Sequence, residues 1–129
     1  MTETTPTPEA TEPAASTDCL FCRIVAGEIP STRVHEDDLV IAIRDIAPRA
    51  PTHILLLPRR HIPSALDLTD ADAPLVGRLF AAAADIARSE GIADAGYRLV
   101  SNVGRWGGQS VDHLHVHLMG GRAFDWPPG

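Results

Sequence analysis

The sequence has no lysine at all, and each of its 11 basic residues is an arginine. Schiff-base catalysis by a side-chain amine is therefore excluded. The net charge of −6 lacks the basic excess that nonspecific nucleic-acid binding needs. No apolar run approaches about 18 residues, which excludes a membrane-spanning helix. The first residues are neither basic nor apolar, unlike a signal peptide. We expect a cytoplasmic protein without a membrane or nucleic-acid partner.

Residues 1–17 are dominated by Thr, Pro, Glu and Ala and contain no basic side chain. Such a segment cannot bury enough apolar surface to offset the entropy lost on ordering. We predict a disordered acidic tail over residues 1–17 and one domain over residues 18–129. That domain is long enough for a small hydrophobic core.

Apolar patterning and turn residues divide this domain into short elements. Asp18 is a suitable helix N-cap and Gly27 a suitable terminator. A second helix begins after Thr69 or Asp72 and ends at Gly91. The predicted helices span residues 19–26 and about 73–90, and the predicted strands span residues 32–36, 39–44, 52–57, 97–102 and 111–119. Two helices and about five mostly antiparallel strands indicate an α+β domain, with residues 52–57 as a central strand.

The second helix carries apolar residues at helical spacing, which predicts one buried stripe. The members of this stripe are Leu75, Val76, Leu79, Phe80, Ala83, Ile86 and Ala87.

Three histidines occur at alternate positions near the C-terminal end: His113, His115 and His117. On a strand, this spacing places their imidazoles on one face, which we expect solvent to reach. The intervening apolar residues, Leu114, Val116 and Leu118, then point into the core. A histidine-rich metal tract is the main alternative explanation.

The segment before the histidines contains Gly107 and Gly108, followed by Gln109 and Ser110. Backbone amides beside glycine can approach phosphate oxygens without obstruction by a Cβ atom. A neutral imidazole can attack phosphorus and form a covalent phosphoramidate, and backbone amides can stabilise the non-bridging oxygens. Together these residues predict a phosphate held against a histidine nucleophile.

Residues 109–122, QSVDHLHVHLMGGR, resemble the signature of the histidine triad (HIT) superfamily. The similarity extends over residues 19–129 and is greatest to the Hint branch, the nucleoside phosphoramidases. The further matching segments are DIAPRAPTH (45–53), PRRHI (58–62), GYR (96–98), Asn102, GGQS (107–110) and WPPG (126–129). The resemblance implies the HIT fold and a homodimer with a continuous sheet, in which WPPG reaches the partner's active site.

The resemblance also implies a role for each matching catalytic residue. His115 would be the nucleophile, and His117 would contact the phosphate near the leaving group. His53 would belong to the histidine network that orients the nucleophile. Ser110 would donate a hydrogen bond to the phosphate.

The same resemblance implies a nucleotide-binding set. It comprises Phe21, Ile29, Asp45, Ile46, Asn102, Gly108, Gln109, Ser110, His115 and His117. Asp45 would accept hydrogen bonds from the ribose, and the three apolar residues would line a purine pocket. The simpler alternatives are core packing for the apolar residues, a turn for Asp45 and a cap for Asn102.

The two cysteines form the motif Cys19-Leu20-Phe21-Cys22. A disulfide, a thioredoxin-type redox pair and a metal site are all possible interpretations. A metal site is favoured, because i and i+3 positions on a helix place both thiols on one face. Several HIT superfamily members bind zinc through such a pair, a histidine after the third strand and the first triad histidine. Those positions here are His61 and His113, which implies a structural Zn²⁺, whereas mammalian Hint-type proteins lack the cysteine pair.

The function expected from these features is hydrolysis of purine nucleoside 5′-phosphoramidates, of the AMP-amide or aminoacyl-adenylate type, through a nucleotidyl-histidine. Three alternatives stay open. They are a dinucleoside polyphosphate hydrolase or nucleotidyl transferase of the same superfamily, a non-catalytic nucleotide-binding scaffold, and a hydrolase whose zinc lies on the three histidines.

Overall fold

The computed structural model describes residues 18–129, so the tail predicted at residues 1–17 lies outside the described part. The elements are α1 (Leu20–Val25), β1 (Arg33–Glu36), β2 (Val40–Arg44), β3 (Thr52–Pro58), the 3₁₀ turns η2 (Ala65–Asp67) and η3 (Asp70–Asp72), α2 (Ala73–Ser89), β4 (Tyr97–Val100) and β5 (Val116–Gly120). The predicted α+β domain with two helices and five strands is confirmed. Among these residues, no helix has the length and apolar character needed to cross a membrane.

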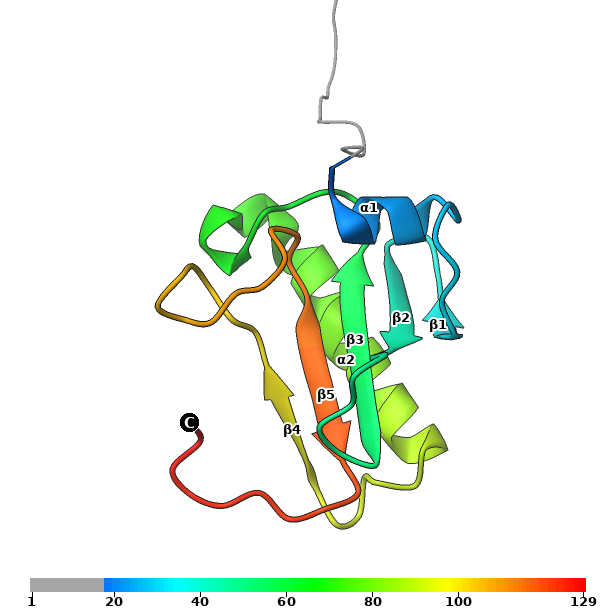
Figure 1. Cartoon of the computed structure of the whole chain (residues 1–129), viewed down its shortest axis with the longest axis vertical. Coiled ribbons are helices and arrows are strands. Elements are labelled where there is room, and N and C mark those ends of the chain that lie inside the picture. Colours follow the sequence, from blue (N-terminus) through cyan, green and yellow to red (C-terminus); the bar gives the residue numbers. More distant parts are fainter. Residues whose placement is uncertain (1–17) are drawn as a thin grey trace, which may run out of the picture.

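The five strands form one antiparallel sheet in the order β1-β2-β3-β5-β4 (Figure 1). All seven residues of β3 are buried. This matches the apolar, β-branched composition that predicted a central strand, because a strand with neighbours on both sides and cover on both faces has no wet surface.

Alternate residues of the sheet pack against different helices. Ile54 and Leu56 of β3 belong to the core that α2 covers, whereas Leu55 and Leu57 pack with α1. Figure 1 shows α2 behind the sheet and α1 at one end of its other face. The face on the α1 side is covered only in part, which leaves room for a site between α1 and the remaining strand surface.

The N-cap of α1 is Cys19, and the prediction of Asp18 is wrong. Cys19 has an extended backbone, and its Sγ accepts a hydrogen bond from the backbone amide of Cys22 at 3.3 Å. The thiol therefore occupies the capping position one residue later than the carboxylate would. Gly27 has a φ of +80° and ends the helix as predicted.

Both proposed caps of the second helix are used in succession. Thr69 and Asp72 form a capping box around η3, and Asp72 is then the N-cap of α2. The apolar stripe is confirmed, with five members buried and Val76 half-buried, except at Phe80, which is 52% exposed; the buried members are Leu75, Leu79, Ala83, Ile86 and Ala87. Phe80 lies at the border of the stripe, along a surface groove that β4 also lines.

The last strand, β5, begins at Val116 and not at residue 111 as predicted. Residues 111–115 bond elsewhere, because the Leu114 amide donates to the Ile62 carbonyl. The preceding strand is shorter too, since the Ser101 hydroxyl donates to the His115 carbonyl just beyond β4. The buried positions predicted for Leu114, Val116 and Leu118 are confirmed.

Candidate active site and metal centre

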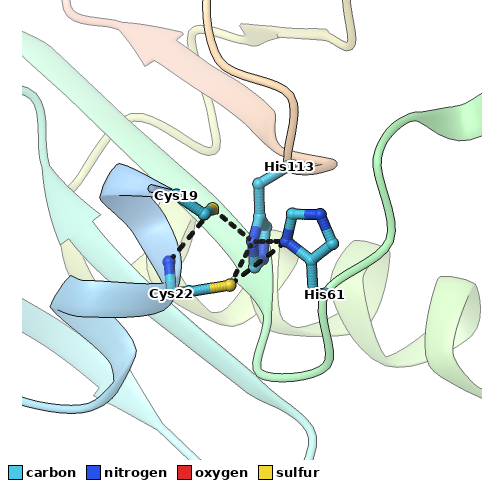
Figure 2. A group of neighbouring side chains, drawn as sticks. All are labelled: Cys19, Cys22, His61 and His113. Carbon is cyan, nitrogen blue, oxygen red and sulfur yellow. Dashed lines mark hydrogen bonds between the residues drawn. The ribbon is translucent and has the colours of Figure 1, made fainter. Parts of the chain in front are cut away.

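Four predicted metal ligands come together at one end of the sheet (Figure 2). Cys19 and Cys22 lie at the start of α1, His61 lies in the loop after β3, and His113 precedes β5. The nitrogen–sulfur separations are 3.4 Å for Cys19–His113, 3.1 Å for Cys22–His61 and 3.5 Å for Cys22–His113, and the two Nδ1 atoms are 3.3 Å apart. His113 is fully buried.

These distances fit a tetrahedral ion. Zinc bonds of about 2.3 Å to sulfur and about 2.0 Å to nitrogen give S···N edges of about 3.5 Å and N···N edges of about 3.3 Å. The carbonyl of Pro58 accepts a hydrogen bond from Nε2 of His113 at 2.9 Å, so the lone pair of this ring is on Nδ1, facing the thiols. Burial lowers the pKa of His113 to about 4, which keeps the ring neutral, as a ligand must be. The donor set therefore fits zinc.

A cavity of about 260 Å³ adjoins this cluster, between α1 and the sheet face that α1 leaves open. It is lined by seven of the residues predicted for the catalytic and nucleotide-binding sets: Phe21, Ile29, Asp45, Ile46, Ser110, His115 and His117. Ile46 is 99% exposed and stands at the rim. The structure thus brings together residues that are spread over almost one hundred positions of the sequence.

His115 borders this cavity although only 3% of the residue is exposed. Its Nδ1 is 2.7 Å from the backbone carbonyl of His113. A carbonyl can only accept, so Nδ1 carries the proton and the lone pair is on Nε2. The Phe21 ring contacts the imidazole edge-on, with the ring centres 5.0 Å apart. The expectation that all three triad histidines reach solvent is wrong for His113, which faces the cysteines instead.

His53 and His117 form a second histidine cluster, beside the cavity. The backbone amide of Arg49 donates to Nδ1 of His53 at 3.0 Å, so the proton of this ring is on Nε2. Nε2 of His53 then donates to Nδ1 of His117 at 2.9 Å, and the proton of His117 is left on its own Nε2. Asp45 places Oδ2 3.4 Å from Nε2 of His53.

Both rings of this second cluster are held neutral. Burial lowers the pKa of His53, against the opposing effect of the Asp45 carboxylate. Burial also lowers the pKa of His117 to about 4, with further contributions from His115 and His53. The 2.9 Å separation of the two rings is that of a hydrogen bond and is shorter than the N···N edge of a zinc site. The hydrogen bonds therefore run in one direction: Arg49 donates to His53, and His53 donates to His117, which lines the cavity.

Three predicted phosphate or ribose contacts have protein partners here. Asp45 accepts from the Ala47 amide at 2.8 Å, and Asn102 donates to the Gly107 carbonyl at 2.7 Å. The Gln109 amide group bonds to Gly104, Pro63 and Val111. Asn102, Gly108 and Gln109 are not among the residues that line the cavity, and their part in nucleotide binding stays a prediction.

Sequence reasoning missed several members of the site. Ile43, Leu55 and Val111 line the cavity, and the Arg49 amide orients His53. The period-two alternation of β3 could have found Leu55, because it shares a face with His53. The contribution of Arg49 is a backbone group and has no signal in side-chain patterns.

A family model for the HIT domain matches residues 26–124. The chain therefore belongs to the HIT domain family, as the resemblance indicated.

Individual relatives are similar over most of their length. The purine nucleoside phosphoramidase of Escherichia coli K12 is 50% identical over 105 residues, which are 81% of this chain and 88% of that protein. A 14 kDa zinc-binding protein of Brassica juncea is 47% identical over 114 residues, covering 87% of this chain and 100% of that protein. The crystal structure of a HIT family hydrolase from Legionella pneumophila Philadelphia 1 superposes with a TM-score of 0.85 at 50% identity, over 87% and 100% of the two chains.

Proposed function

We propose that this chain hydrolyses purine nucleoside 5′-phosphoramidates, of the AMP-amide or aminoacyl-adenylate type, through a nucleotide bound covalently to His115. One observation carries the proposal. The bond from Nδ1 of His115 to the His113 carbonyl leaves the lone pair on Nε2, in a residue that lines the cavity. The name of the Escherichia coli relative supports the substrate class.

In the first step, the Nε2 lone pair of His115 attacks phosphorus. With a phosphoramidate, the new N–P bond forms as the P–N bond to the amine breaks, and the amine leaves with the proton that its nitrogen carries in the zwitterionic form. With an aminoacyl adenylate, the P–O bond to the acyl group breaks and a carboxylate leaves. The positive charge on the modified ring is stabilised by the His113 carbonyl at Nδ1. In the second step, a water oxygen bonds to phosphorus, the bond to Nε2 breaks, and one water proton passes to solvent.

His117 supports both steps as a hydrogen-bond donor. Its Nδ1 is occupied by His53, so Nε2–H is the group left for a phosphate oxygen in the cavity. Ser110 lies on the same cavity wall and offers a hydroxyl. Phe21, Ile29 and Ile46 give the base an apolar slot. Oδ2 of Asp45, 3.4 Å from Nε2 of His53, has a further lone pair for the ribose hydroxyls. A slot of this kind discriminates by stacking and shape.

The test is a His115→Ala variant. We expect it to lose turnover of AMP-amide by at least about a thousandfold and to keep its affinity for AMP. Intact mass measured after an alkaline quench should show one added nucleotidyl group in the wild type and none in His115→Ala. His35→Ala is the matched control, because His35 bonds to Asp37 outside the cavity. Retained turnover in His115→Ala would refute the covalent mechanism.

A substrate panel sharpens the reaction class. AMP-amide and GMP-amide should be cleaved faster than dinucleoside polyphosphates. The reverse order would favour a polyphosphate hydrolase, and binding without turnover of any member would favour a scaffold.

We also propose that Cys19, Cys22, His61 and His113 hold a structural zinc ion. The tetrahedral distances and the tautomer of His113 support this, as does the zinc-binding name of the Brassica relative. Four protein ligands leave no position for a substrate or water, so the ion would cross-link α1 to the β3–β5 end of the sheet. His115 and His117 bond elsewhere, which argues against an ion held by the three triad histidines.

The homodimer is likewise a proposal. β4 is an edge strand, and an apolar groove of about 260 Å³ runs between it and α2, with Phe80, Leu99 and Val116 in its lining. Pairing of two β4 strands would extend the sheet and cover this groove. The Trp126 side chain of the C-terminal segment is 85% exposed and is available for contact with such a partner. Sedimentation at several concentrations tests the assembly, and a monomer at all of them would refute it.

A further inference from the structure

We infer that Arg122 is a positioning residue for the phosphate site: by holding Arg49 it fixes the tautomer in which His117 presents Nε2–H to the nucleotide. This rests on the proposed function for its ligand, a nucleoside monophosphate group. Arg122, Arg49 and His53 lie outside the cavity, and only His117 at the end of this chain of contacts lines it.

The first link is the donor order of the second histidine cluster. A neutral imidazole has one donor and one acceptor nitrogen, so the group that bonds to the first ring decides the state of both rings. The closest such group outside the cluster is the Arg49 amide, which can only donate, to Nδ1 of His53 at 3.0 Å; Oδ2 of Asp45, 3.4 Å from Nε2, favours the same tautomer through a longer contact. Without it, His53 could place its proton on Nδ1 and accept from His117 at Nε2. His117 would then present a lone pair to the anionic phosphate.

The second link is what holds Arg49. Nε of Arg122 donates to the Arg49 carbonyl at 3.0 Å. The guanidinium is itself fixed by the Phe124 ring, whose centre lies 4.0 Å from its central carbon. Arg49 is exposed and belongs to the loop between β2 and β3. An exposed loop residue has few contacts of its own. The bond from Arg122 therefore keeps the Arg49 amide directed at Nδ1 of His53.

The third link is close packing of the same two segments. Gly121 has a φ of +87°, and a Cβ atom there would lie 2.8 Å from Cβ of Pro51. The backbone beside Arg122 therefore rests directly on the loop that carries Arg49. Contact and hydrogen bond together place the loop against the turn that follows β5.

The chain offers a matched control in Arg98. Its guanidinium also lies over Phe124, at 4.9 Å, and donates to the carbonyls of Asp125 and Pro128. It anchors the same C-terminal segment, but the carbonyl of Arg49 is bonded to Arg122. Arg98→Ala therefore loosens the segment and spares the contact that the inference needs.

The experiment measures tautomers and binding in Arg122→Ala, Arg122→Lys and Arg98→Ala. Nitrogen-15 NMR of the histidine rings at neutral pH should show wild-type His117 protonated on Nε2. Arg122→Ala should show a mixture of Nε2 and Nδ1 forms, Arg122→Lys a partial return, and Arg98→Ala the wild-type pattern. Affinity for AMP should fall about fivefold in Arg122→Ala, the equivalent of one hydrogen bond, while affinity for adenosine stays unchanged.

Other outcomes would overturn the inference. An unchanged His117 tautomer in Arg122→Ala would do so, as would equal losses for AMP and adenosine, which indicate a general structural effect. The same loss in Arg98→Ala would assign the effect to the C-terminal segment as a whole. The NMR readout needs no turnover, so a wild type that fails to cleave phosphoramidates would refute the proposed function and leave this test intact.

Discussion

The two histidine clusters use the same side chain in opposite ways. His113 presents the lone pair of Nδ1 to two thiols, because its Nε2–H donates a hydrogen bond to the Pro58 carbonyl. His117 presents the proton of Nε2 to the cavity, because His53 occupies Nδ1. In each ring, the partner of one nitrogen decides what the other can do. The hydrogen-bond partner of each ring, and not the histidine alone, therefore separates the candidate metal cluster (Cys19, Cys22, His61 and His113) from the second histidine cluster.

The largest disturbance of this contrast is removal of a thiol from the metal cluster. We expect Cys22→Ser to lose bound zinc and to lower the free energy of unfolding by on the order of 3–5 kcal/mol. Chemical denaturation and measurement of zinc per chain would check both effects. His35→Ala, outside the cluster, should keep its zinc. A Cys22→Ser protein with full zinc content would contradict the assignment of this ligand.

An intermediate effect concerns protonation of His117 in the second histidine cluster. The pKa of His117 is lowered to about 4 in the folded chain, so between about pH 6.5 and 4 the unfolded chain binds a proton that the folded chain does not. Stability is then fully present above about pH 6.5 and falls toward pH 4, by up to about 3 kcal/mol from this residue. His117→Gln should show a flatter decline of unfolding free energy over that window. Parallel curves for the two proteins would contradict the prediction.

The smallest effect is expected at Phe21, which lies between the candidate metal cluster and the proposed nucleophile. The Phe21 ring contacts both His113 and His115, with ring centres 5.9 Å and 5.0 Å away, and it lines the cavity. Phe21→Leu keeps an apolar side chain and removes the ring. We expect the binding free energy of AMP, measured by calorimetry, to weaken by about 1 kcal/mol. Ile24→Val, in the same wall, removes only one methyl group and should change it less.

The sequence predicted most of the fold, because strands and helices here follow local patterns. An apolar, β-branched run identified β3, and helical spacing identified α2. Failures occurred where a group that the sequence pattern does not reveal replaced the expected partner. The Cys19 thiol took the capping position from Asp18, and the bond from Leu114 to Ile62 shortened β5.

Seven of the predicted residues line the cavity, whereas the direction of the hydrogen bonds in the candidate site could not be predicted from the sequence. The spacing of the triad and the CxxC motif indicated which residues matter, and the resemblance supplied His61 and His53. The tautomers depend on backbone groups of Pro58, His113 and Arg49, whose positions arise only when the sheet and loops are folded. Such contacts leave no trace in side-chain patterns.

The middle strand, β3, gives both clusters a common scaffold. His53 lies near its first residue and the carbonyl of Pro58 at its last. One strand therefore connects the second histidine cluster to the candidate metal cluster. A slip of one residue in its pairing would turn His53 toward α2 and withdraw that carbonyl in the same movement. Chains with a shifted β3 register would therefore lack both clusters. A folded form with only one of the two should not accumulate.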